Sequence, residues 1–244
     1  MLTGSVIFNL AGFDLFCPGH LMILCLVPVF TAVLTAVCMK IPDRYSQILI
    51  RSLSVLIFVC ELTQDVILTL EGGNILNYLP LHLCNIGIFV NLAASFGKGR
   101  IREFFSEVSL TLILPGAAFA LITPDWNYRP LLSWLPLMCF FTHSLLVAVP
   151  VMMYARNYCR PSFRHFYYPY VFLILAAIPV YFFDKAVNRN YMYLLWPADG
   201  SPLEWLAGCM GNPGYLIGAL IILAAVLSVI YSILMIIEKA GKRS

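Results

Sequence analysis

The chain of 244 residues is 61% hydrophobic and 11% charged, with a net charge of +3 and a mean hydropathy of +0.87. Soluble domains carry about a quarter charged residues, so this composition excludes an ordinary soluble domain. Membrane topology explains the small positive charge, and we expect no nucleic acid partner. The length leaves room for membrane spans and little else, so we predict one membrane domain over residues 1–244.

A helix needs about 20 apolar residues to cross the hydrocarbon core of a bilayer. Seven stretches meet this requirement: roughly 18–40, 46–70, 77–96, 103–123, 130–155, 165–184 and 213–237. The start of the chain, MLTGSVIFNLAGFDLF, has no basic segment and no cleavage site of small residues, so we do not expect a removed signal peptide. The predicted fold class is therefore all-α, a polytopic membrane protein with a bundle of about seven transmembrane helices.

The basic residues divide unequally between the two sides of such a bundle. One side receives Lys40, Arg44, Arg51, Lys98, Arg100, Arg102, Arg156, Arg160, Arg164, Lys239, Lys242 and Arg243. The other side receives only Arg129, Lys185 and Arg189. Because cytoplasmic loops carry the excess of Lys and Arg, we predict a cytoplasmic C-terminus and an N-terminus outside.

The second predicted helix carries a stripe of polar residues. At about 100° per residue, Arg51, Ser54, Glu61, Gln64 and Asp65 fall within one arc of its surface. Charge in hydrocarbon costs several kcal/mol, so the stripe must face the bundle interior and is a candidate functional site. Glu61 and Asp65 lie one turn apart, and like charges at that distance favour protonation or pairing of one of them. The structural alternative is that both acids merely satisfy the next helix or Arg51.

The third predicted helix opens with the sequence LPLHLCN. Pro80 suits the first turn of a helix, which would place His82, Cys84 and Asn85 in the first two turns. A helix N-terminus stabilises a thiolate, and a neighbouring histidine can act as a base. On a regular helix, however, His82 and Cys84 point about 200° apart, whereas His82 and Asn85 share a face. The geometry thus favours a His82–Asn85 pair, with Cys84 packed in the core or turned inward by a distortion.

His143 lies near the middle of the fifth predicted helix, in CFFTHSLL. A lone histidine in a membrane helix is often a hydrogen-bonded core residue. If it faces the same cavity as the polar stripe, it is a second acid or base. Two histidines with Glu61 and Asp65 could also hold zinc, but no HxxxH or HExxH spacing is present. We therefore predict neither a metal site nor another cofactor.

The longest predicted outer segment, residues 185–212, is rich in Tyr, Trp and Asn and is broken by Pro and Gly. Aromatic residues prefer the membrane interface, so we expect an aromatic loop that covers the outer face. The candidates for substrate binding are polar residues of the stripe, of the third predicted helix and of the outer rim formed by the end of the sixth predicted helix and this loop. They are Gln64, Asn85, Asp184, Asn188, Asn190 and Tyr191.

Two motifs, LPLHLC at 79–84 and NYMYLLWP at 190–197, resemble the YwaF-type family of bacterial integral membrane proteins, and the pattern of spans fits almost the whole length. The resemblance implies a multi-pass protein of the bacterial cytoplasmic membrane. A distant eukaryotic branch is described as transferring acyl chains between phospholipids through a membrane cysteine and histidine. That histidine corresponds to His82. Leu81 stands where the branch has its cysteine, and Cys84 follows the histidine.

The leading functional hypothesis is a lipid or acyl-transfer enzyme, or a lipid hydrolase, with an outward-facing polar cavity. In this reading His82 is the general base, Glu61 or Asp65 orients it, and His143 stabilises charge or donates a proton. Cys84 is the alternative nucleophile to water or a hydroxyl group. The expected partners are membrane lipids and a lipid or small-molecule substrate.

Two other classes remain open from the sequence. The first is a carrier for a small solute that uses Glu61 or Asp65 for proton coupling, as intramembrane carboxylates often do. The second is a receptor or assembly factor whose cavity holds a lipid or small ligand without chemistry.

Overall fold

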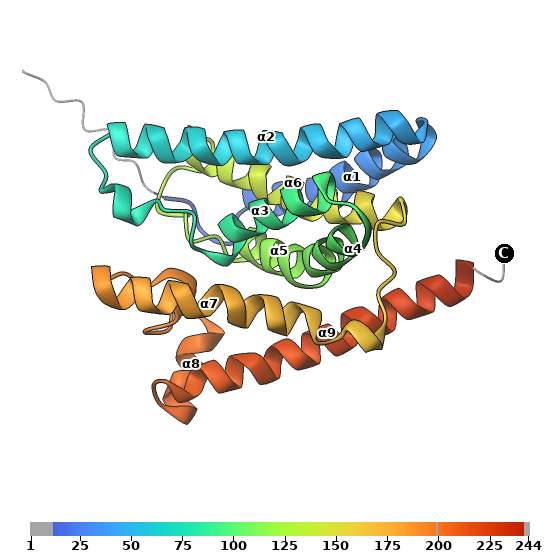
Figure 1. Ribbon diagram of the computed structural model, residues 1–244. Coiled ribbons are helices and arrows are strands. Elements are labelled where there is room, and N and C mark those ends of the chain that lie inside the picture. Colours follow the sequence, from blue (N-terminus) through green and yellow to red (C-terminus); the bar gives the residue numbers. More distant parts are fainter. Residues whose placement is uncertain (1–11, 199, 242–244) are drawn as a thin grey trace, which may run out of the picture.

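The computed structural model describes residues 12–198 and 200–241, and within these residues the regular structure is entirely helical (Figure 1). The predictions made for residues 1–11 and for the last two basic residues lie outside this range. Six helices of the described chain are long and apolar enough to cross a membrane. The all-α class and the multi-pass membrane character are therefore confirmed, whereas the membrane orientation remains a prediction.

The helices follow one another along the chain with short connections. They are α1 (Pro18–Lys40), α2 (Asp43–Leu70), α3 (Leu83–Phe96), α4 (Gly99–Val108), α5 (Leu114–Ile122), α6 (Trp134–Ala155), α7 (Tyr168–Val187), α8 (Pro202–Met210) and α9 (Gly214–Gly241). A π-helical turn, η2 (Ser109–Ile113), joins α4 and α5 into one continuous span. The 3-10 turns are η1 (Ile75–Asn77), η3 (Phe163–His165) and η4 (Tyr191–Tyr193).

The third predicted span is shorter than expected. Helix α3 begins at Leu83 instead of residue 77, and His82 is an extended residue at its N-cap. Pro80 biases the residue before it away from helical geometry, and the chain enters α3 as the turn η1 followed by extended backbone. Its 14 residues cover about 21 Å, less than the ~30 Å of a hydrocarbon core. Seven full-length spans are thus not confirmed.

Helix α3 runs antiparallel to α2. Asn85, near its start, donates a hydrogen bond to Glu61, while Ser95, near its end, shares a hydrogen bond of 2.6 Å with Ser54. The residue numbers rise along α3 as they fall along α2, so α3 carries the chain from the end of α2 back toward its beginning. The short helix therefore reverses the chain direction as a complete span would.

The bundle has two chemically different ends (Figure 1). The one we call the basic end contains residues 40–43, 96–99 and 155–165, and there Arg156 forms an ion pair of 2.9 Å with Asp43. The described basic residues of the larger predicted group lie at or near it. The other, which we call the loop end, contains residues 71–82, 123–133 and 188–213, where Arg129 approaches Glu71 at 3.8 Å.

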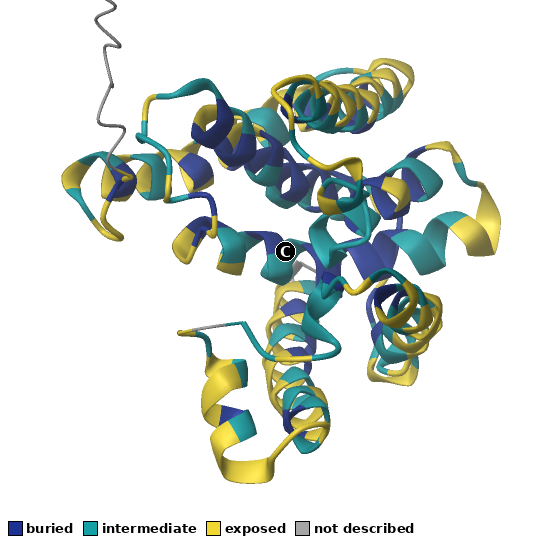
Figure 2. Ribbon diagram, turned by 90° about the vertical axis from the view of Figure 1, so that its left-hand side faces the viewer, coloured by how far each residue is buried: buried dark blue, intermediate teal, exposed yellow. Residues whose placement is uncertain are grey.

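The core lies around α6 and the continuous α4–η2–α5 span, which are the most buried of the long helices. Figure 2 shows the buried residues gathered in the middle of the bundle, with exposed residues along the outer helices. Helix α3 approaches η2 so closely that a Cβ atom on Gly87 would lie 2.4 Å from Cγ2 of Ile113. The outer faces of α1, α7 and α9 expose large apolar side chains, as lipid-facing helices do.

The predicted aromatic loop at 185–212 is more ordered than expected, because it contains the turn η4 and the nine-residue helix α8. Helix α8 packs against α9, where a Cβ atom on Gly218 would lie 2.9 Å from Cδ2 of Leu206. Gly218 thus allows α8 to lie close to α9, and this contact fixes where the loop joins α9.

Candidate functional site

The loop-end half of the α2 stripe contacts α3 and α6. The carboxylate of Glu61 accepts a hydrogen bond from Nδ2 of Asn85 on α3. The side-chain oxygen of Gln64 accepts a hydrogen bond of 3.3 Å from the thiol of Cys139 on α6. Asp65, one turn beyond Glu61, is half-buried. This half of the stripe therefore faces the bundle interior, where it joins three helices.

The basic-end half of the stripe also faces α3. Nε of Arg51 donates to the backbone oxygen of Ser95 at 3.2 Å, and Ser54 bonds to the hydroxyl of the same residue. Ser54 and Ser95 are fully buried. These contacts are interhelical hydrogen bonds of the kind that hold membrane helices together. In the described structure Arg51 is not paired with Glu61 or Asp65. Of the two contacts in the structural alternative for these acids, the one between Glu61 and the next helix is present and the one with Arg51 is not.

His82 lies beneath the turn η4. Its Nδ1 atom accepts a long hydrogen bond of 3.4 Å from the backbone N–H of Met192. The rings of Tyr191 and Tyr193 flank the imidazole, with centroids 5.0 and 5.7 Å away. Because Nδ1 accepts, the neutral ring carries its proton on Nε2. Burial lowers the pKa of His82, and the carboxylate of Asp125 acts in the opposite direction.

The predicted His82–Asn85 pair is not formed. Asn85 donates to Glu61, whereas His82 contacts η4. The prediction assumed that both residues stand on regular helix, but His82 is the extended N-cap residue and its side chain does not follow the helical angle. Cys84 is half-buried and packs against the main hydrophobic core. That contact agrees with the packing alternative for this cysteine.

His143 on α6 has the opposite tautomer. Its Nδ1 atom donates to the backbone oxygen of Cys139 at 2.8 Å, so the lone pair of the neutral ring lies on Nε2. No hydrogen bond engages Nε2 within the described residues. The imidazole centre lies 4.8 Å from the ring of Trp126, which is itself buried and whose indole N–H has no hydrogen-bond partner in the described part of the chain. His143 is therefore held by its backbone contact with an accepting nitrogen free.

Asp125 links these groups electrostatically. It lies in the connection between α5 and α6, and its carboxylate is within electrostatic range of His82, Cys84, His143 and Tyr193. The sequence analysis did not single out Asp125, which follows Pro124 between two predicted spans. The available signal was an acidic residue directly at the end of a span and next to a tryptophan, on the side where the polar stripe ends.

Three of the predicted substrate-binding residues, Asp184, Asn188 and Asn190, lie at the end of α7 or just after it. Asp184 is fully buried at the end of α7, so it does not line an open rim as predicted, and its carboxylate has no hydrogen-bond partner among the described residues. Asn188 is the left-handed C-cap of α7. Asn190 uses its side-chain oxygen to accept the backbone N–H groups of Leu195 and Trp196. Asn188 and Asn190 thus shape the loop.

Tyr191 connects the two sequence motifs. Its side chain is 3% exposed, and its hydroxyl donates to the backbone oxygen of Leu76 at 2.5 Å and accepts the N–H of Leu79 at 3.2 Å. The segment at 190–197 therefore lies against the start of LPLHLC. Tyr191 positions the loop over His82, which is a different role from the predicted contact with substrate.

A second polar cluster lies nearer the basic end and was missed by the sequence reasoning. Glu107 is fully buried and contacts Nδ1 of His165 at 2.8 Å, while the hydroxyl of Tyr231 donates to its other oxygen at 2.8 Å. Glu107 falls inside the predicted span at 103–123, so the criterion that selected Glu61 applied to it as well. The cluster joins α4, η3 and α9.

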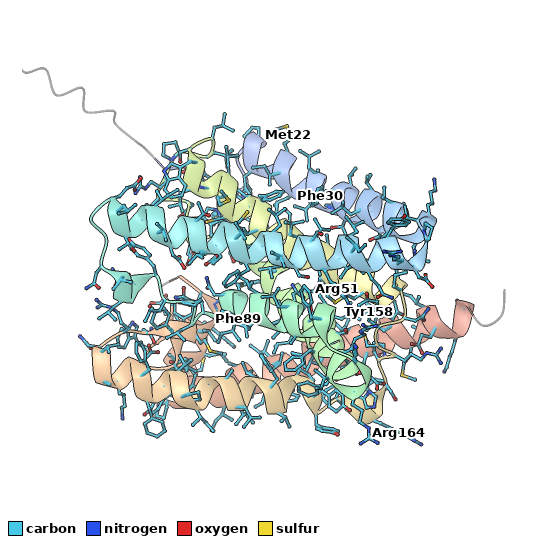
Figure 3. All side chains as sticks on the ribbon, turned by 45° about the horizontal axis from the view of Figure 1, so that its top comes forward. Met22, Phe30, Arg51, Phe89, Tyr158 and Arg164 are labelled. Carbon is cyan, nitrogen blue, oxygen red and sulfur yellow. The ribbon has the colours of Figure 1, made fainter. Side chains whose placement is uncertain are left out.

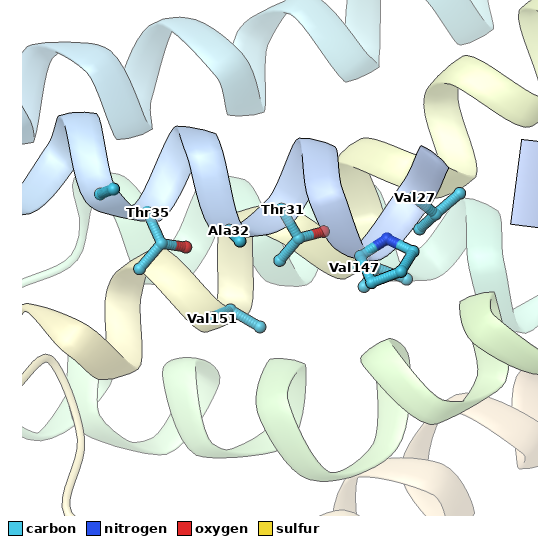
Figure 4. A pocket seen from close by; sticks show the side chains of 8 residues that line it. Val27, Thr31, Ala32, Thr35, Val147 and Val151 are labelled. Atoms are coloured by element: carbon cyan, nitrogen blue, oxygen red, sulfur yellow. The ribbon is translucent and has the colours of Figure 1, made fainter. Parts of the chain in front are cut away.

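The polar residues at and near the loop end form what we call the loop-end cluster: Glu61, Gln64, Asp65, His82, Asn85, Asp125, Cys139 and His143. Two hollows lie away from it. The larger, of about 590 Å³, is an apolar groove between α1 and α6 whose lining includes Val27, Thr31 and Val147 (Figure 4). The smaller, of about 400 Å³, lies beside α2 near the basic end. Neither includes a residue of the loop-end cluster, so the predicted outward-facing cavity remains a prediction. Within the described residues, no group of three or more His, Cys, Asp or Glu could hold a metal ion.

The fold and this site define a multi-pass helical membrane protein with a polar cluster enclosed at one end of its bundle. Residues 15–231 match the family model described as the TMEM164 family, and the chain belongs to that family. No curated protein and no solved structure matches the chain. The family match confirms membership of a membrane-protein family, whereas the finer YwaF-type and bacterial assignments are not confirmed by it.

Proposed function

We propose that the chain is a membrane-embedded enzyme that acts on lipid esters, by acyl transfer to a hydroxyl group or by hydrolysis. The observation that carries this proposal is the complementary state of two histidines at the loop end. His143 has an accepting Nε2, His82 has a donating Nε2–H, and the carboxylate of Asp125 is within range of both rings.

His143 is the proposed general base. A base must present a lone pair to the attacking hydroxyl, and the bond from Nδ1 to the oxygen of Cys139 fixes the tautomer that does so. A carboxylate near the ring stabilises the imidazolium that forms, and Asp125 supplies it. This assignment reverses the sequence-based hypothesis, in which His82 was the base.

His82 is the proposed hydrogen-bond donor. In the reaction, water or a lipid hydroxyl attacks the ester carbonyl while His143 takes its proton. The negative charge that develops on the carbonyl oxygen accepts a hydrogen bond from Nε2–H of His82. The tetrahedral intermediate collapses with loss of the original alkoxide, and the imidazolium of His143 returns the proton to it. Water as the attacking group gives hydrolysis, and a second hydroxyl gives acyl transfer.

The test uses purified protein in liposomes whose phospholipid carries a labelled acyl chain. Mass spectrometry then measures labelled fatty acid and the transfer of label to other lipids. We expect His143→Gln and His82→Gln each to lower the rate at least about 100-fold, the usual size of a general acid or base contribution. His165→Gln is the matched control, because it changes a histidine of the other cluster while an amide can still donate to Glu107.

Folded wild-type protein that leaves every acyl chain in place would contradict the proposal. Cys84→Ser distinguishes a packing role of this cysteine from a role as the nucleophile. If Cys84 is only a packing residue, as its core contacts suggest, the serine variant retains the activity. An abolished activity with a trapped acyl group on the cysteine would instead favour the thioester route.

The carboxylate pair of α2 supports a second candidate, proton-coupled transport of a small solute. Glu61 and Asp65 lie one turn apart, and Glu61 has an interhelical partner in Asn85 that could exchange as a proton is bound. Proton-gradient-dependent uptake into vesicles that is lost in Glu61→Gln, with no change in lipid composition, would favour the carrier over the enzyme.

A further inference from the structure

At the basic end, three arginines surround a buried tyrosine. Tyr158 follows α6 and is 9% exposed, and its hydroxyl has no hydrogen-bond partner among the described residues. The guanidinium carbon of Arg102 lies 4.6 Å from the centre of its ring. Burial raises the pKa of Tyr158, while Arg102, Arg51 and Arg156 are near enough to oppose that shift. Figure 3 shows Arg51 and Tyr158 together at this end.

The three guanidinium groups differ in how far they are engaged. Both terminal nitrogens of Arg156 are engaged, because one pairs with Asp43 and the other donates to the backbone oxygens of residues 38 and 41. Arg51 and Arg102 donate only through Nε, to the backbone of Ser95 at 3.2 Å and of Gly97 at 3.0 Å. Within the described chain their terminal nitrogens have no hydrogen-bond partner. The end of α3 thus holds two arginines whose outer donors are free.

One of these arginines also closes an apolar groove on the membrane-facing side of α2. This is the smaller hollow, of about 400 Å³, lined by Arg51, Ser52, Val55, Leu56, Val59 and Phe96. The guanidinium lies over the ring of Phe96, 5.3 Å from its centre. Val55, Leu56 and Val59 continue along α2 toward the loop end and are exposed. The groove is therefore cationic at one end and apolar along its length.

We propose that this groove is a binding site for an anionic phospholipid from the leaflet at the basic end. The phosphate would contact the free nitrogens of Arg51 and Arg102, and the acyl chain would lie along Val55, Leu56 and Val59. Planar guanidinium groups bind phosphate through paired hydrogen bonds, and basic pockets between membrane helices recognise anionic head groups.

Charge complementarity selects this occupant over a zwitterionic lipid or a protein helix. Among the side chains that contact the three arginines, Asp43 is the single acidic one in the described structure, so positive charge is in excess. The site is independent of the proposed lipid chemistry, because Arg51 precedes Glu61 by ten residues of α2, about 15 Å along the helix.

The experiment compares thermal unfolding of the purified full chain in detergent after addition of dioleoyl phosphatidylglycerol, dioleoyl phosphatidylcholine or inorganic phosphate. A ligand that binds the folded state raises the melting temperature, and at equal concentration the rise is larger for a ligand that binds more tightly. We expect phosphatidylglycerol to stabilise the wild type more than phosphatidylcholine does. Arg51→Gln combined with Arg102→Gln should weaken its apparent affinity about 25-fold, at roughly fivefold for each arginine.

Matched variants separate the parts of the site. Arg44→Gln combined with Arg100→Gln removes the same charge from exposed positions at the same end and should leave the affinity unchanged. Val59→Trp fills the groove and should weaken the lipid effect, whereas Val66→Trp, equally exposed at 48% but outside the groove, should not.

Three results would overturn the proposal. Equal stabilisation by phosphatidylglycerol and phosphatidylcholine would show that the site does not select an anionic head group. Equal loss in the two arginine double variants would show a general surface attraction with no specific site. Stabilisation by inorganic phosphate as large as that by phosphatidylglycerol, unaffected by Val59→Trp, would show an anion site without a lipid.

Discussion

The rings of His82 and Tyr191 meet edge to face with centroids 5.0 Å apart, although they belong to motifs from distant parts of the chain. The hydroxyl of Tyr191 is bonded to the backbone on both sides of residues 77 and 78, just before the LPLHLC motif. The backbone N–H of Met192 then faces Nδ1 of His82. The buried Tyr191 therefore fixes the position of the loop over His82. The loop in turn fixes which nitrogen of His82 carries the proton.

Tyr191→Phe should destabilise the fold. The substitution keeps the ring but leaves the carbonyl of Leu76 and the N–H of Leu79 without their partner, at a cost of about 1–3 kcal/mol. Thermal unfolding in detergent measures the effect. Tyr128→Phe, at an exposed position of the same end, should change the melting temperature little. Equal effects of the two substitutions would show that the Tyr191 hydroxyl does not hold the loop.

Stability should fall in acid because of His82. Burial lowers its pKa below the ordinary value of 6.5, so the unfolded chain binds the proton more tightly than the folded chain does. The contribution is complete above pH 6.5, and it is lost as the pH falls from there toward the lower pKa of the folded state. The melting temperature of the wild type should therefore drop more steeply below pH 6.5 than that of His82→Gln. Parallel curves would contradict this.

The hydrogen bond between Asn85 and Glu61 should appear in a double-mutant cycle. Asn85→Ala leaves the carboxylate of Glu61 without a partner and should cost about 1–3 kcal/mol. In the variant that also carries Glu61→Ala, that penalty is removed, so the two losses should not add. Chemical or thermal unfolding of the four proteins gives the coupling. Additive losses would mean that the contact contributes nothing to stability.

Gly87→Ala should be destabilising because of the close approach of α3 to η2. The new Cβ atom would lie 2.4 Å from Cγ2 of Ile113, and overpacking of this kind typically costs about 1–3 kcal/mol. Ile113→Ala removes the clashing atoms at the cost of a core cavity, so in that background the further substitution Gly87→Ala should cost less than it does in the wild type. Gly208→Ala is the control, because nothing lies within 4 Å of its Cβ position in α8. There alanine should be neutral or stabilising, by up to about 1 kcal/mol.

Much of the fold follows from local patterns that the sequence displays directly. The run of apolar residues predicts α1 with the bounds it has in the structure, residues 18–40. The 100° rule placed Ser54, Glu61 and Gln64 on one face of α2, and all three contact α3 or α6. These predictions succeed because a membrane helix satisfies its own backbone, so the side-chain pattern alone determines which face turns inward.

The tertiary structure decided the features that depend on where the ends of helices meet. The start of α3 moved to Leu83 because of the backbone around Pro80, and that shift turned His82 away from Asn85 and toward η4. The approach of Asp125 to His82 and the tautomer of His82 arise from contacts between segments distant in sequence. Such contacts have no period along the chain. The sequence by itself determined a helical membrane protein with an inward-facing polar stripe, whereas the packing of its loops decided which polar groups meet and which nitrogen of His82 carries the proton.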